Sequence, residues 1–112
     1  MNNRYKNVLL KLKEEAEILL ELMDGYGLQG FLGSEMLRRA VSMTLINIGE
    51  LVNRLTDEIK QQNSAVPWRA ITNLCNVAAH GYDALDMENI RKTVTEDVPS
   101  FLTQLGEILQ RE

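Results

Sequence analysis

The fold of this 112-residue chain is decided by residues 34–62, which read SEMLRRAVSMTLINIGELVNRLTDEIKQQ. Apolar side chains, with one threonine among them, recur there at spacings of three and four, the period of one face of an α-helix. They are Leu37, Ala40, Val41, Thr44, Leu45, Ile48, Leu51, Val52, Leu55 and Ile59. Ser34 suits the N-cap position, and Glu35 then places a negative charge in the first turn, where the helix dipole favours it. The pattern predicts one long helix from Leu32 or Ser34 to Gln62.

The same stretch carries a second, weaker apolar edge made of Met36, Met43 and Ile46. A helix that is apolar around more than one face must bury the additional face against something. We therefore expect this helix to pack against two layers, or against one layer and another protomer.

Two further helices are predicted before and after this one. Residues 4–24 carry apolar side chains at helical spacing, and the glycines that follow, in the segment DGYG at 24–27, relieve the turn after a helix. Residues 67–80 begin with Pro67, which suits a first helical turn, and end before Gly81.

The last helix is predicted to begin at a cap formed by Asp86 and to carry an apolar pattern as far as Leu109. Pro99 lies inside that pattern and should kink or split the helix. No stretch of the sequence has the alternation of a strand. The sequence therefore predicts an all-α, up-and-down four-helix bundle that forms a single domain over residues 1–112.

The composition is that of a folded globular protein, with 45% hydrophobic and 25% charged residues. The single cysteine cannot form an internal disulfide, no N-terminal segment resembles a signal peptide, and no apolar run approaches the roughly 20 residues that span a bilayer. We therefore expect a cytoplasmic protein that does not enter a membrane. The net charge of −4 argues against broad, non-specific nucleic-acid binding but leaves room for a local RNA site.

The residues that could carry chemistry gather in residues 75–82, CNVAAHGY, which hold the only cysteine and the only histidine. At 100° per residue, a polar stripe runs along the predicted third helix, opposite an apolar side that includes Cys75. The stripe consists of Arg69, Asn73, Asn76 and His80. The end of a helix favours the charged form of a histidine such as His80. A polar stripe is also what the solvated face of any amphipathic helix looks like, so the residues alone leave a site and a plain surface both open.

Metal binding and thiol chemistry find little support in the sequence. One histidine and one cysteine match no zinc pattern, and the carboxylates form no cluster suited to paired acid–base work. Cys75 lies on the apolar side of its helix, where a thiol is more often packed than reactive. We therefore predict no metal site and no cofactor.

Taken in order, these residues resemble the HepT-like branch of the HEPN superfamily, a group of small all-helical proteins of bacteria and archaea. The resemblance covers nearly the whole chain and is carried by Ile48-Gly49-Glu50, Val66-Pro67-Trp68 with Ile71, Asn76…His80-Gly81-Tyr82 and Asp97-Val98-Pro99. The signature of that family is an arginine, four residues, a histidine, any residue and a tyrosine. The combination of segments is fairly specific.

The resemblance implies a metal-independent ribonuclease that serves as the toxin component of a HepT/MntA-type toxin–antitoxin pair. It implies that His80 and Asn76 are catalytic residues and that Tyr82 accepts AMP from a minimal nucleotidyltransferase antitoxin. It also implies a homodimer in which the third helices of both protomers face a shared cleft, where RNA would bind.

The chain departs from the family signature at Cys75, which stands in the arginine position. A cysteine cannot supply the positive charge that stabilises the transition state of phosphate chemistry. Arg69 precedes His80 by eleven residues, about 16 Å along a helix axis, so Arg69 or Arg91 would compensate only by reaching across a dimer cleft. We expect a ribonuclease that is weakened or inactive. The alternative is a non-catalytic HEPN module that binds a nucleotide, RNA or a protein as a homodimer.

Overall fold

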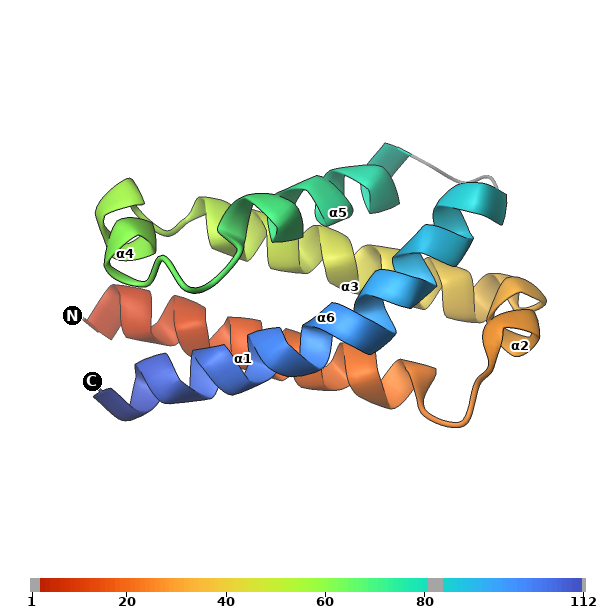
Figure 1. Ribbon diagram of the computed structural model, residues 1–112, viewed down its shortest axis with the longest axis horizontal. Helices are drawn as coiled ribbons and strands as arrows, with labels where there is room; N and C mark the ends of the chain where they lie inside the picture. Colours follow the sequence, from red (N-terminus) through yellow and green to blue (C-terminus); the bar gives the residue numbers. More distant parts are fainter. Residues whose placement is uncertain (1–2, 81–83, 112) are drawn as a thin grey trace.

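The described part of the chain is built from four long helices and two short ones. The structure is a computed structural model that describes residues 3–80 and 84–111, with the side chains of all of these except His80 and residues 84–86. The helices are α1 Asn3–Met23, α2 Leu28–Leu32, α3 Glu35–Asn53, α4 Asp57–Gln62, α5 Trp68–His80 and α6 Ala84–Arg111. Figure 1 shows α1, α3, α5 and α6 running alternately in opposite directions. The predicted all-α, up-and-down four-helix bundle is confirmed.

The core is formed by one face of each long helix. The most deeply buried large side chains are Phe31, Leu9, Leu12, Leu19, Leu45, Ile48, Met87, Ile90, Leu105, Val41, Val52 and Val94. The apolar stripe predicted on residues 34–62 lies in this core, apart from Ala40, which is half-buried. Burying a side chain of the size of leucine or isoleucine contributes on the order of 2 kcal/mol, so this stripe is a main source of stability for the bundle.

Two predicted helix ends are confirmed in detail. The Ser34 hydroxyl accepts a hydrogen bond from the backbone N–H of Leu37 at 3.1 Å, which makes Ser34 the N-cap of α3. Gly25, which follows the end of α1, has a φ of +81°, a conformation that residues with a Cβ rarely adopt. The chain can therefore turn back sharply after α1.

The long helix predicted for residues 34–62 is wrong in one respect, because the structure divides it into α3 and α4. Residues 54–56 lie between the two helices. Thr56 is extended, and its hydroxyl accepts a hydrogen bond from the N–H of Ile59 at 3.2 Å, so it is the N-cap of a new helix. Leu55 and Ile59 are both buried, so the apolar period continues through the break and conceals it.

The last helix begins earlier than predicted, and the kink predicted at Pro99 is confirmed. α6 begins at Ala84, so Asp86 lies inside its first turn instead of capping it. The helix continues through Pro99 without splitting, and Figure 1 shows that its axis changes direction along its length. A proline removes one helical hydrogen bond and bends the axis, and neighbouring contacts keep the helix intact. The short α2 was not predicted, although its Phe31 is completely buried.

The second apolar edge of α3 is not covered within the chain. Met36 is 81% exposed, Met43 is 57% exposed, and Ile46 is half-buried. Burial of this edge by a second layer of the same chain is therefore wrong, and burial by another protomer stays a prediction. Within the described ranges, none of the helices combines the length and the apolarity that crossing a bilayer requires.

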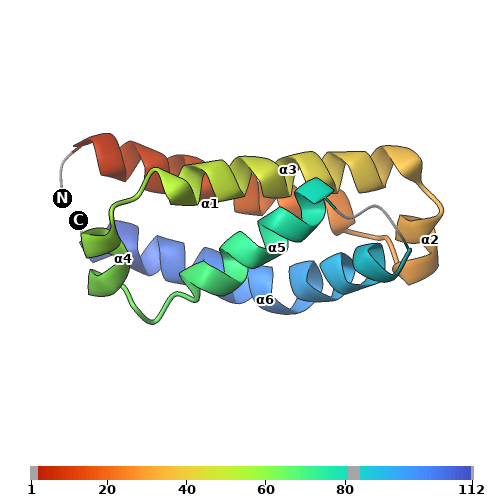
Figure 2. The ribbon, with the colours of Figure 1, turned by 90° about the horizontal axis from the view of Figure 1, so that it is seen from above.

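The position of α5 is set by a close approach to α3. Figure 2 shows α5 crossing the bundle obliquely, with its first turns beside α6 and its last turn beside α3. Gly49 of α3 faces Cys75 of α5 so closely that a Cβ on Gly49 would lie 2.8 Å from the Cβ of Cys75. Packed atoms do not approach to this distance. The absence of a side chain at Gly49 therefore sets the separation of the two helices.

We expect Gly49→Ala to lower the free energy of unfolding by about 1–3 kcal/mol, because the added methyl group pushes α5 away from α3. Inside a helix, alanine would otherwise be favoured over glycine by about 1 kcal/mol. Gly106 of α6 is the matched control, since a Cβ there would meet nothing within 4 Å, and Gly106→Ala should stabilise the protein. Urea unfolding measures both changes. Stabilisation by both substitutions would show that the helices do not meet at Gly49.

Candidate functional site

Trp68 fixes the first turn of α5 to the rest of the bundle. Its indole Nε1 donates a hydrogen bond to the carbonyl of Asn63 at 3.2 Å. Its ring meets the ring of Phe101 on α6 edge-on, with the ring centroids 6.1 Å apart. The side-chain amide of Gln104, also on α6, donates to the carbonyl of Ala65 at 2.9 Å. These contacts hold the start of α5 against α6 and set the direction in which α5 continues.

The polar stripe predicted on α5 is present where the structure describes it. Arg69, Asn73 and Asn76 are exposed, whereas Cys75 and Ala78 are buried on the opposite side. None of the three exposed side chains forms a hydrogen bond or an ion pair with another described residue. Their polar groups are therefore able to bind a ligand or water.

The other two predicted site residues can be located only along the chain. α5 ends at His80, whose side chain lies outside the described part of the structure, and Tyr82 lies outside the described residues. Because an α-helix has 3.6 residues per turn, His80 follows Asn76 by one turn of α5. The roles assigned to His80 and Tyr82 stay predictions.

Cys75, in the position of the signature arginine, is a packed and neutral side chain. Only 4% of it is exposed, and it lies against Gly49 of α3. Burial raises the pKa of the Cys75 thiol to about 11, and a backbone hydrogen bond with Gly49 offsets only part of this rise. At neutral pH the group is therefore a thiol, which is neither a cation nor an effective nucleophile.

The two arginines considered as substitutes lie away from Cys75. Arg69 precedes it by six residues, about 9 Å along the axis of α5, and lies with Lys60 at a shallow depression of about 400 Å³. Arg91 is two positions before Thr93, which faces the space between α5 and α6. A step of two residues turns a helix by about 200°, so Arg91 points away from α5. A contribution from either arginine across a dimer stays a prediction.

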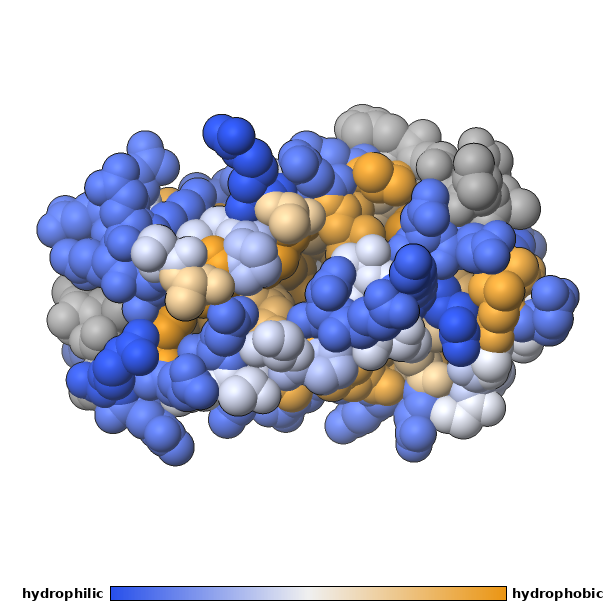
Figure 3. All heavy atoms as spheres, viewed as in Figure 1, coloured by the Kyte–Doolittle hydropathy of each residue, from blue (hydrophilic) through white to orange (hydrophobic). Residues whose placement is uncertain are grey.

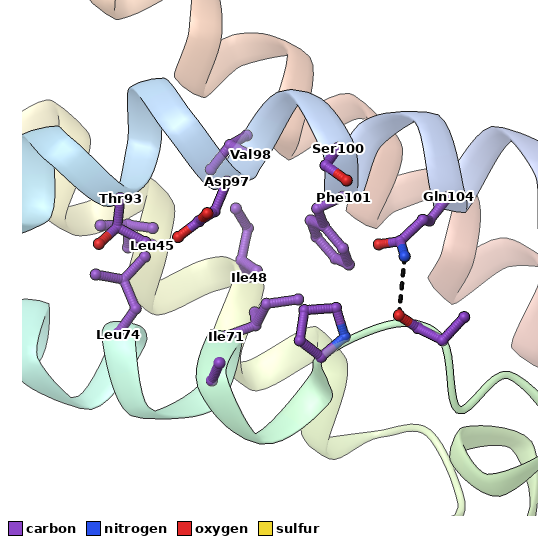
Figure 4. Close-up of a pocket in the computed structure, with 13 residues that line it drawn as sticks. Leu45, Ile48, Ile71, Leu74, Thr93, Asp97, Val98, Ser100, Phe101 and Gln104 are labelled. Atoms are coloured by element: carbon purple, nitrogen blue, oxygen red, sulfur yellow. Dashed lines mark hydrogen bonds between the residues drawn. The ribbon is translucent and has the colours of Figure 1, made fainter.

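A cavity of about 450 Å³ lies between α3, α5 and α6, on the side of α5 away from the polar stripe. Figure 4 shows Thr93 and Asp97 on α6 facing Leu74 on α5 across this cavity. The side chains that make its apolar wall are Leu45, Ile48, Ile71, Leu74, Val98 and Phe101. This cavity could not be predicted from the sequence, because its lining comes from three helices whose neighbours are set by the fold. The spacing of Thr93, Asp97, Ser100 and Gln104 along one edge of α6 was its only signal in the sequence.

The described side chains offer no set of metal ligands. Within residues 3–80 and 84–111, no three histidine, cysteine, aspartate or glutamate side chains gather around one point. Among the described residues, Asp97 is the only charged one at the cavity between α5 and α6, and stable metal sites in proteins draw on several ligands. A metal site would need ligands beyond the described side chains.

The chain is similar to known proteins over nearly its whole length. The family described as "Ribonuclease HepT-like" matches residues 12–108, which take in α3, α5 and most of α1 and α6. "Putative RNase TTE0752" of Caldanaerobacter subterraneus subsp. tengcongensis is 32% identical over 99 residues, 88% of each chain. "Probable ribonuclease HepT" of Thermococcus cleftensis is 28% identical over 100 residues, 89% of this chain and 91% of that protein. "Putative RNase MJ1380" of Methanocaldococcus jannaschii is 30% identical over 94 residues, 84% of this chain and 86% of that protein. No solved structure matches the chain significantly.

The raised pKa of Cys75 predicts a loss of stability in alkaline solution. In the unfolded chain the thiol ionises near its ordinary pKa of 9.0, whereas in the folded protein it ionises near 11. At intermediate pH the unfolded state therefore binds fewer protons than the folded state. The stability that depends on the neutral thiol is complete below pH 9 and is lost as the pH rises toward 11, by about 2–3 kcal/mol in total.

Urea unfolding at pH 8 and pH 10.5 measures this loss. Cys75→Ala is the control, because it lacks the thiol and keeps every other ionisable side chain. The variant should lose less stability between the two pH values. An equal loss in both proteins would contradict a buried thiol at this position.

Proposed function

The chain belongs to the HepT-like family of ribonucleases, and on this basis we propose that it is the toxin-type half of a toxin–antitoxin pair whose ribonuclease activity is weak or lost. Family membership and the names of the relatives support RNA cleavage as the ancestral chemistry. The observation that carries the proposal is Cys75, a buried and neutral side chain where the family signature has an arginine.

RNA can be cut by its own 2′-hydroxyl group without a metal ion. The 2′-oxygen loses its proton and attacks the neighbouring phosphorus, the 5′-oxygen leaves and takes up a proton, and negative charge develops on the phosphate oxygens. A histidine with a pKa near neutrality suits both proton transfers, and we assign them to His80, acting alone or with the His80 of a second protomer. Asn76 is exposed one turn earlier, which supports a role as a hydrogen-bond donor to a phosphate oxygen.

The group that this chemistry lacks is a cation beside the phosphate. An arginine stabilises the developing charge through two parallel hydrogen bonds, whereas the Cys75 thiol supplies neither charge nor a strong donor. Removal of one such stabilising group typically lowers a rate by about a hundredfold or more. Rescue by Arg69 or Arg91 would require one of them to reach the phosphate from the other protomer.

A homodimer is part of the proposal and rests on the uncovered apolar edge of α3. Met36 and Met43 expose most of their apolar surface, and grouped apolar side chains of this kind are typical of contact surfaces between proteins. Ile46 extends the edge toward Gly49, which lies three residues later and contacts α5. Pairing of two copies along this edge would bring two α5 helices, and with them two copies of His80, toward one cleft.

The proposed partner is a minimal nucleotidyltransferase antitoxin of the MntA type. Tyr82 has the spacing from His80 that the family signature requires of the AMP acceptor. A nucleotide attached to Tyr82 would add bulk and negative charge two residues from His80, and negative charge repels an RNA phosphate. Modification of Tyr82 would therefore silence whatever ribonuclease activity remains.

We expect the purified protein to cleave single-stranded RNA slowly and Cys75→Arg to increase the rate by about a hundredfold, because the substitution restores the missing cation. Val77→Arg is the matched control, since it adds the same charge to the same helix. Val77 is 39% exposed and lies about 200° around α5 from Cys75, so its substitution should leave the rate unchanged. Gel analysis of labelled RNA measures the rates, and circular dichroism confirms that each variant is folded.

Two outcomes of this assay would contradict the proposal. Fast cleavage by the natural sequence that His80→Ala abolishes would show that Cys75 does not weaken the enzyme. Equal gains from Cys75→Arg and Val77→Arg would show that added charge improves RNA binding in general and that the arginine position has no special role.

Co-expression with a nucleotidyltransferase encoded beside this gene should add one AMP to Tyr82. Intact-mass spectrometry detects the addition, and peptide mapping assigns it to a residue. The variant Tyr82→Phe keeps the ring and lacks the acceptor hydroxyl, so it should stay unmodified. An unmodified natural protein after co-expression would contradict the proposed pairing.

The second candidate function is a non-catalytic module that binds a nucleotide, RNA or a protein, and the neutral Cys75 also favours it. Expression in cells without a partner distinguishes the two candidates. A toxin with residual activity slows growth, and His80→Ala relieves the effect. A binding module leaves growth unchanged, and His80→Ala then weakens only the binding of RNA or nucleotide.

A further inference from the structure

The cavity between α5 and α6 is not used by the proposed ribonuclease chemistry. Leu74 lines this cavity, while Asn76 belongs to the polar stripe. Two positions along a helix correspond to a turn of about 200°, so these side chains point to opposite sides of α5. A ligand in the cavity and an RNA strand on the polar stripe would therefore occupy different faces of the molecule.

The cavity is open because α5 and α6 diverge from a fixed end. Trp68, Phe101 and the hydrogen bond from Gln104 to the carbonyl of Ala65 hold the helices together at the start of α5. Figure 2 shows α5 then moving away from α6 toward α3, and Figure 3 shows apolar surface in the hollow between α5 and α6. Since Gly49 holds α5 against α3, α5 cannot swing back to close the hollow without losing that contact.

The shape of the hollow is that of a groove. Its lining on α6 runs from Thr93 to Gln104, which is about 16 Å along the helix axis, and its lining on α5 runs from Ala70 to Leu74, about 6 Å, with Pro67 just before the helix. A length of 16 Å corresponds to about three turns of an α-helix. Helices bind in such grooves by inserting apolar side chains spaced three and four residues apart.

Among the side chains that the structure describes, the lining of the groove carries one charge, the carboxylate of Asp97. Asp97 is exposed and has no hydrogen-bond or ion-pair partner among the described residues. Two neighbouring polar groups are already engaged, since Thr93 donates to the carbonyl of Asn89 and Gln104 donates to that of Ala65, whereas the neutral hydroxyl of Ser100 lies at the same edge. A phosphate would be repelled by the carboxylate and would gain nothing from the apolar wall, so the groove does not suit RNA.

We propose that the groove between α5 and α6 is a docking site for an amphipathic α-helix of a partner protein, which places apolar side chains against Leu74 and Phe101 and a lysine or arginine beside Asp97. Leu45, Ile48, Val98 and Phe101 are already buried by the chain itself, so the affinity comes from burial of the surface that Ile71 and Leu74, which are half-buried, still expose. The ion pair with Asp97 is exposed and strengthens binding at most about fivefold, so it sets the orientation of the helix more than the strength of binding. The proposal does not depend on whether the chain cleaves RNA.

Binding in this groove can be measured through the fluorescence of Trp68. Trp68 is the only tryptophan, and its ring contacts Phe101, which lines the groove. A helix seated against Phe101 changes the surroundings of the indole and therefore its fluorescence. A 14-residue synthetic helix of leucine and lysine without tryptophan serves as the probe, and the same peptide with glutamate in place of lysine is its control.

We expect the lysine peptide to change the Trp68 emission in a saturable way and the glutamate peptide to bind at least tenfold more weakly. Asp97→Asn should weaken binding of the lysine peptide about threefold to fivefold. Glu96→Gln is the matched control, because it removes the same charge from the preceding residue of α6, which does not line the groove. It should leave the affinity unchanged.

Ala70→Phe provides a test that does not depend on charge. Ala70 is exposed at the groove, so the larger side chain fills the groove without disturbing the core and should abolish binding. Equal binding of the two peptides, equal effects of Asp97→Asn and Glu96→Gln, or full binding by Ala70→Phe would each overturn the proposal. Sedimentation of the protein alone adds a further outcome, since a dimer that Ala70→Phe dissociates would assign the groove to a second copy of this chain and overturn a foreign partner.

Discussion

The contact between Gly49 and Cys75 determines the arrangement on which both candidate sites depend. α5 has 13 residues and is anchored at its start by Trp68 and farther along by this contact. With these two anchors, the rotation of the helix and its distance from α3 are both set. One side of α5 then presents Arg69, Asn73 and Asn76 to solvent, and another side forms one wall of the apolar groove. A change in the separation at Gly49 would alter both surfaces together.

The helices could be predicted from the sequence where their apolar period and their caps agree. Ser34 and the buried stripe that follows it are examples, because an N-cap hydroxyl and a repeat of 3.6 residues are properties of a single helix. The division between α3 and α4 could not be found from the spacing of apolar residues, since Leu55 within the division and Ile59 after it are both buried. The local mark of the division is the N-cap at Thr56, which the structure shows.

The candidate site also has features that the sequence predicts and features that only the structure reveals. That Cys75 lies on the apolar side follows from its position on one helix, so the sequence was sufficient. The neutral state of its thiol depends on the approach of Gly49, which is a property of two helices and becomes visible only in the structure. The groove depends on three helices, and no pattern within α5 or α6 alone shows that Leu74 and Asp97 face each other. The exposed edge at Met36 and Met43 is a further case, because apolar spacing predicts that a surface will be covered but not which molecule covers it.

The absence of a side chain at Gly49 also affects which substitutions position 75 can accept. Cysteine and arginine codons can differ by a single base, as UGC and CGC do, so one common transition separates Cys75 from the complete family signature. Since α3 has no side chain opposite position 75, a longer residue there would meet the backbone of Gly49 and not another side chain. One base change in either direction therefore exchanges the two residues.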